Sequence, residues 1–162
     1  MAVAIKGSRL IKEESTTTTF DVKLEGDFIA QEQTTRDWQS ISVNSDNGDV
    51  WACVGESDIY KKTTGDFVAQ GQTSRNWRGI SVNSDNGDVW ACVINGDIYK
   101  KTTGDFIAQE QTTRDWRCIS VNSSNGDVWA CDYDGDIYKK TTGDFIAQGQ
   151  TVRAWRGISV NP

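Results

Sequence analysis

Tryptophan and arginine side chains recur along this sequence at a constant spacing, and both types are suited to ligand binding. An indole ring stacks its apolar face on the C–H groups of a sugar, while its N–H fixes the orientation of the ligand. A guanidinium group holds carboxylates and hydroxyl groups through its fork of hydrogen-bond donors. The candidate ligand-binding residues are Trp51, Trp90, Trp129, Arg36, Arg75, Arg114, Arg153, Asn76 and Asp115.

The same side chains also have a structural interpretation, which we favour. Tryptophans that repeat with every unit fit a core between neighbouring sheets. Arginines that repeat in a polar segment fit clamps that bond loop carbonyls or pair with the acid beside them. A second set of tryptophans, to which the core interpretation applies as well, is Trp38, Trp77, Trp116 and Trp155.

The chemistry of catalysis finds little support in the sequence. There is no histidine, the side chain most often used as a general base near neutral pH. Paired carboxylates such as Asp46 with Asp49 lie in repeated turns with repeated surroundings, whereas a catalytic pair needs two unequal environments. A phosphate-cradling GxxxxGK[ST] loop and a CxxC metal motif are both absent. We therefore predict a protein that is not an enzyme and that needs no cofactor.

The segment from Asn44 to Trp51 resembles an Asp-box and also part of a calcium loop, because its side chains carry many oxygens. The third copy has Ser124 in place of an aspartate, and no bidentate glutamate follows at the required distance. A hairpin that is capped by its own Asn and Asp side chains, with glycine at positive φ, explains the same pattern. No metal site is predicted.

A repeat of 39 residues positions all of these side chains. Each unit has four short apolar segments, typified by ISV, VWACV, IYKKT and FIAQ, and the first three joints contain glycine, as hairpin turns do. The fourth joint is polar and lacks glycine, which suits a crossing to the next sheet. The sequence thus predicts an all-β fold, a four-bladed β-propeller with ISV innermost and FIAQ outermost. The units begin at Asp27, Asp66, Asp105 and Asp144.

The two ends of the chain are expected to close the ring within one blade. The ISV segment occurs four times, whereas VWACV-like and IYKKT-like segments occur three times. We expect residues 156–160 to form the innermost strand of the last blade and the first 33 residues to supply its other three strands. Closure would remove exposed sheet edges. Residues 1–8 are predicted to be an arm, and residues 9–162 a single propeller domain.

Charge and hydropathy limit the partners. A formal net charge of −6 repels nucleic-acid phosphates and anionic lipid surfaces. No apolar run approaches the about 20 residues that span a bilayer, and the start of the sequence lacks the apolar core of a secretory signal. We expect synthesis in the cytoplasm without a signal peptide, no nucleic acid partner and no membrane insertion. Association with copies of itself stays open.

The cysteines are expected to be free thiols. Cys53, Cys92 and Cys131 occupy one position of the repeat, and Cys118 stands alone. This pattern fits a small buried side chain that was copied with its unit. It does not fit a disulfide framework.

The segment WRGISVNSDNGDVWACVINGDIY, residues 77–99, resembles a tectonin-type propeller repeat. Repeats of the DIYKxTxGDF type resemble those of marine and cyanobacterial phage proteins, and the resemblance covers residues 26–162. For tectonin-like families it implies binding of glycans or cell surfaces, and for the phage proteins a place on the virion.

Two functions follow as expectations. The first is a non-catalytic, lectin-like module that recognises glycan or cell-surface ligands at several equivalent clefts between blades, where weak sites gain avidity. The alternative is a phage virion structural protein, such as a capsid-decorating, tail or adaptor component. In that case the ring acts as a rigid scaffold for protein–protein contacts, and the N-terminal arm docks on other virion proteins.

Overall fold

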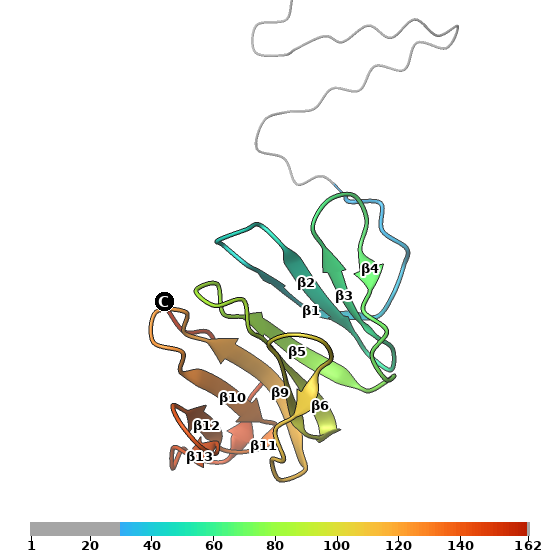
Figure 1. Ribbon diagram of the computed structural model, residues 1–162. Helices are drawn as coiled ribbons and strands as arrows, with labels where there is room; N and C mark the ends of the chain where they lie inside the picture. The colour runs from blue at the N-terminus through green and yellow to red at the C-terminus, as the bar shows by residue number, and fades with distance from the viewer. Residues whose placement is uncertain (1–29, 162) are drawn as a thin grey trace, which may run out of the picture. The chain divides into compact units, whose positions relative to one another are not determined.

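The computed structural model describes residues 30–161, and all regular structure within them is β-strand. Contacts divide the chain into two units, Met1–Gln33 and Thr34–Pro162. The architecture concerns the second unit, whose antiparallel sheets are strongly curled (Figure 1). The predicted boundary between residues 8 and 9 lies outside the described residues. Within residues 30–161, no helix is long and apolar enough to cross a membrane.

Three repeats follow one another, each with four antiparallel strands, and we call them the first, second and third blades. A short pairing between the second and third blades joins these two into one eight-stranded sheet. In each, the strand order is that of the sequence, as predicted from the ISV, VWACV, IYKKT and FIAQ segments. The first blade contains β1 (Trp38–Val43), β2 (Val50–Val54), β3 (Ile59–Lys62) and β4 (Val68–Ala69). The second contains β5 (Trp77–Val82), β6 (Val89–Gly96), β7 (Ile98–Lys101) and β8 (Ile107–Ala108). The third contains β9 (Arg114–Val121), β10 (Val128–Asp132), β12 (Ile137–Lys140) and β13 (Ile146–Ala147).

The turn between the first two strands of each blade is capped by its own side chains. In the first blade the backbone N–H of Asp46 donates to Asn44 Oδ1 at 2.9 Å, and Gly48 has a φ of 76°. Lys61 Nζ lies 2.6 Å from Asp49 Oδ2, and the hydrogen bond from Lys61 lowers the pKa of the Asp49 carboxyl. The capped-hairpin interpretation is thus confirmed. Residues 30–161 contain no group of three potential metal-ligating side chains.

Neighbouring blades pack face to face. Trp77 of the second blade is 1% exposed and contacts Tyr99 edge-on, with ring centroids 5.2 Å apart. It joins side chains of the first blade, among them Trp51 and Ile59, in one apolar cluster. A second cluster, which contains Trp116, repeats this arrangement between the second and third blades. The predicted core role of the tryptophans that precede each innermost strand is confirmed for these two.

Serine side chains join the innermost strands of successive blades. The backbone N–H of Val82 donates to Ser42 Oγ at 3.1 Å, and that of Val121 donates to Ser81 Oγ at 3.0 Å. The same bond recurs from Val160 to Ser120 at 3.2 Å. The serine of the ISV segment, which lies between two apolar residues, thus serves as a hydrogen-bond acceptor for the backbone of the next innermost strand.

The fourth copy of the innermost strand, residues 155–161, is called the C-terminal copy. It lies against the third blade through the Val160–Ser120 bond, but it forms no β-ladder with the described residues. The prediction of a strand at residues 156–160 is therefore not met within residues 30–161. A strand requires a paired neighbour, and the neighbour expected for this one belongs to residues 1–29, outside the described residues.

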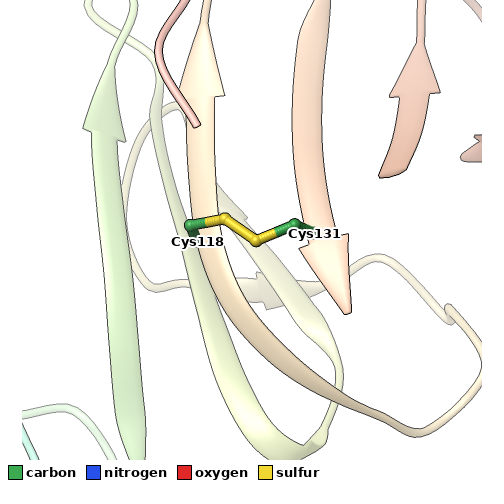
Figure 2. Close-up of a disulfide and its surroundings, with 2 residues drawn as sticks. All are labelled: Cys118 and Cys131. Carbon is green, nitrogen blue, oxygen red and sulfur yellow. A yellow bond between two sulfur atoms is a disulfide. The ribbon is translucent and has the colours of Figure 1, made fainter. Parts of the chain in front are cut away.

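Two of the four cysteines form a disulfide, so the expectation of four free thiols is wrong. Cys118 and Cys131 face each other on β9 and β10, with Cα atoms 5.4 Å apart (Figure 2). The equivalent partners of Cys92 and Cys53 are Gly79 and Ser40, which offer no second sulfur. These two thiols are buried and free, and burial raises the pKa of Cys53 to about 12 and raises that of Cys92 as well.

Alkylation of the unfolded, unreduced protein is expected to label two thiols per chain, and prior reduction should raise this to four. In the native protein neither thiol should react, because both are buried and largely protonated at neutral pH. Intact-mass spectrometry counts the labels. Four labels without reductant would contradict the Cys118–Cys131 bond.

Candidate functional site

Successive repeats meet at one end of the sheets, which we call the variable end. There the turn between the second and third strands of one blade pairs with the crossing segment that leads into the next repeat. The pairs are Ser57 with Arg75, Gly96 with Arg114, and Gly135 with Arg153. We call these the first, second and third junctions. The third is formed by β11 (Asp134–Gly135) and β14 (Arg153–Ala154).

The candidate tryptophans of the second strands lie mainly in the core. Trp51 and Trp90 are 6% and 5% exposed. Each contacts, edge-on, the Phe that precedes the outermost strand of the next blade, Phe106 at 6.3 Å and Phe145 at 6.2 Å between ring centroids. Trp129 is half-buried. Buried rings offer no face to a sugar, so the structural interpretation accounts for Trp51 and Trp90.

Three of the candidate arginines act as clamps within their own blades. The guanidinium carbons of Arg36, Arg75 and Arg114 each lie 4.7 Å from the centroid of a tyrosine ring on the third strand. Such cation–π contacts contribute about 0.5–1 kcal/mol at partly exposed sites. The tyrosines are Tyr60, Tyr99 and Tyr138. Arg153 is exposed and contacts no tyrosine of residues 30–161 in this way.

Asn76 and Asp115 occupy equivalent positions in the crossing segments. In each, the buried side-chain oxygen Oδ1 accepts no hydrogen bond from the described residues. The other carboxylate oxygen of Asp115 accepts from Arg117 Nη2 at 2.8 Å. The candidate set thus does not converge on a single site. Its arginines, Asn76 and Asp115 lie at the variable end, whereas Trp51 and Trp90 belong to the core and Trp129 is half-buried.

The repeats differ from one another mainly at the variable end. The crossing position before the first tryptophan reads Asp37, Asn76, Asp115 and Ala154, and the junction turn begins with Gly55, Ile94 or Tyr133. The turns at the opposite end are almost unchanged, although residues such as Asn47, Asn86 and Asn125 are exposed there. Exposure alone therefore does not explain where the differences fall. The three junctions are therefore alike in their backbone pairing but differ in their side chains.

Tyr133 is the centre of a cluster that sequence reasoning missed. The guanidinium carbons of Arg117 and Arg156 lie 4.8 Å and 5.2 Å from the centroid of its ring. Arg156 Nη2 also donates to the Tyr133 hydroxyl at 3.1 Å. The signal in the sequence was an aromatic hydroxyl at a position that differs in every repeat, since the two equivalent residues are Gly55 and Ile94.

No protein-family model matches the chain, and no curated protein sequence matches it. Its fold is similar to that of a Niastella koreensis GH74 enzyme, a β-propeller, with a TM-score of 0.60 and 17% identity over 84% of this chain and 22% of that one. A nidogen/laminin complex gives a TM-score of 0.57 and 12% identity over 72% and 51% of the two chains. The computationally designed protein Ika4 gives a TM-score of 0.63 and 12% identity over 86% of this chain and 89% of that one.

At these identities the comparisons establish a β-propeller-like, repeat-built fold and nothing more. This chain spans 22% of the GH74 enzyme and 51% of the nidogen/laminin chain. The absence of catalysis stays a prediction, and so does the resemblance to tectonin and phage repeats.

Proposed function

We propose that this protein is a non-catalytic recognition module, a lectin-like, four-bladed β-propeller that binds glycan or cell-surface ligands at the junctions between repeats. The variable end is the observation that carries the proposal. Blades that are nearly identical wherever they hold the fold, but diverse at one end, are what a scaffold with a recognition surface requires. The ligand class is supported by the arginine and tyrosine side chains collected there.

Closure into four blades is supported by the uncovered face of the first blade. Ile41 and Val43 are 63% and 55% exposed, whereas their equivalents Ile80 and Val82 are 3% and 5% exposed. In the second blade this face is covered by the preceding blade. This apolar face of β1 is suited to being covered by a further blade, which we propose is formed by residues 9–33 and the C-terminal copy.

The half-buried Trp129 supports closure as well. Its equivalents Trp51 and Trp90 each contact the Phe of the GDF motif in the following blade. In a four-bladed ring, the blade that follows Trp129 would contain the first GDF motif of the sequence, which carries Phe28. We expect Phe28 to cover Trp129 in the closed ring, with residues 9–33 in the same blade as the C-terminal copy.

A glycan array probed with the full chain tests the recognition function. We expect binding to a restricted set of glycans, and weaker binding when one junction is blocked by replacing Asp134, an exposed residue of the third junction, with a bulky Trp. The matched substitution Asn125→Trp, at an exposed turn of the opposite end, should leave binding unchanged. Absence of binding across a broad panel would contradict the lectin-like function.

A virion building block is the second candidate, and the outermost strands favour it. Val68, Ile107 and Ile146 are 61–63% exposed and occupy the same position in three repeats. A regular row of exposed apolar side chains suits contact with a neighbouring subunit. If no glycan binds and the protein instead co-assembles with a capsid or tail protein encoded beside it, this candidate replaces the first.

A further inference from the structure

We propose that the third junction is an acidic-sugar site, in which Arg156, Arg117 and Tyr133 hold the carboxylate of a uronic or sialic acid residue. This inference rests on the proposed lectin-like function and names the ligand class of one of its junctions. It also replaces the expected set of several equivalent sites by a single principal site per chain.

Charge compensation distinguishes the two arginines of this site. Arg117 forms an ion pair with Asp115, with 2.8 Å between Nη2 and Oδ2. Arg156 is exposed, and within residues 30–161 no carboxylate lies within ion-pair distance of it; its hydrogen-bonding partner there is the uncharged Tyr133 hydroxyl. An anion that reaches the junction thus meets one guanidinium group whose charge is not already compensated by the described residues.

The geometry of the donors suits a carboxylate. Arg156 gives one N–H to the tyrosine hydroxyl oxygen, which leaves its remaining donors in a planar fork that matches the two oxygens of a carboxylate. Because the Tyr133 hydroxyl accepts from Arg156, its own proton points elsewhere and can be donated to the same anion. The ring contacts both guanidinium groups and its hydroxyl is bonded to Arg156, so the hydroxyl is held in place before the ligand arrives.

The first and second junctions lack this combination. In the first, Arg78 hydrogen-bonds through Nη1 to Gln39 Oε1, and the turn carries Gly55. In the second, the turn carries Ile94 at the position of Tyr133. A tyrosine ring in contact with two guanidinium groups therefore occurs at the third junction alone among the three junctions of the described residues, and we expect a stoichiometry of one.

Titration calorimetry with the full chain tests the site, with trigalacturonic acid, its methyl ester, sialyllactose, lactose and sulfated lactose as probes. We expect both carboxylated sugars to bind at least about tenfold more tightly than the ester or lactose, since a charge-assisted pair is lost with the carboxylate. Arg156→Gln should remove most of this preference, and Tyr133→Phe part of it. Both variants should keep the wild-type melting temperature, because Gln39 occupies the position of Arg156 in the first blade.

Arg78→Gln is the matched control, since it makes the same substitution at the same strand position but outside this site. It should change the affinity for trigalacturonic acid by less than about twofold. An equal loss in Arg78→Gln and Arg156→Gln, equal binding of the acid and its ester, or a stoichiometry of three would overturn the assignment. Sulfated lactose that binds as tightly as sialyllactose would overturn the choice of carboxylate.

Failure of this site and failure of the proposed function give different results. If the glycan array shows only neutral ligands, and Arg156→Gln binds them normally, the lectin-like function stands and the acidic-sugar site is refuted. If no glycan binds at all, both are refuted.

Discussion

Replacement of Ile41 by aspartate is expected to destabilise the protein as strongly as the same replacement of Ile80. Ile80 is buried between the first and second blades, where a carboxylate loses its hydration without gaining a partner. Loss of a buried isoleucine side chain alone costs about 2–5 kcal/mol in the free energy of unfolding, and an uncompensated charge adds to this. Ile41 reaches the same burial only if a fourth blade covers β1, so its response reports directly on ring closure.

The control for this pair is Ile107→Asp on the outermost strand β8, where the side chain is 63% exposed. Its free energy of unfolding should change by less than about 0.5 kcal/mol, as is usual for surface substitutions. Urea unfolding followed by tryptophan fluorescence measures all three variants. If Ile41→Asp behaves like Ile107→Asp, the first blade has an open face and the four-bladed ring is refuted.

Replacement of Trp77 by alanine should lower the free energy of unfolding by about 3–5 kcal/mol, the range for a fully buried tryptophan. The indole contacts the rings of Tyr99 and Phe106 at 5.2 Å and 6.0 Å between centroids, and it shares a cluster with both the first and second blades. Its removal therefore weakens the packing between two blades as well as that within one. Its Nε1 has no hydrogen-bond partner among residues 30–161, so the loss comes from packing.

Trp77→Phe provides the comparison for this substitution. A phenyl ring keeps an aromatic contact with Tyr99 and fills part of the space, so it should retain a substantial part of the lost stability. Thermal melting and urea unfolding both report the effect. A loss below about 1 kcal/mol for Trp77→Ala would contradict the core role of this residue.

Much of the fold could be predicted because the same local pattern recurs with every repeat. Apolar segments bounded by glycine turns specify hairpins, and three copies agree on the order of the four strands. The capped turn at Asn44 follows from side chains that bond their own backbone, which is a local property. Local interactions of this kind are readable from sequence because their partners are a few residues apart.

The candidate site was harder to predict, because repetition directs attention to what the copies share. The shared residues have structural contacts: Trp51 packs one blade against the next, and Arg36 contacts a tyrosine of its own blade. Tyr133 and Arg156 belong to different repeats and meet only at the third junction. Their proximity depends on how one repeat is placed against the next.

The sequence by itself determined the period, the all-β class, the four strands of each blade and their order, since each follows from apolar patterning and turn residues within 39 positions. Only the tertiary structure decided which side chains face each other across strands and between blades. The register of β9 against β10 places Cys118 opposite Cys131, and the packing of blades buries Trp90 while it leaves Ile41 exposed. These outcomes depend on long-range geometry, where a shift of one residue exchanges the two faces of a strand.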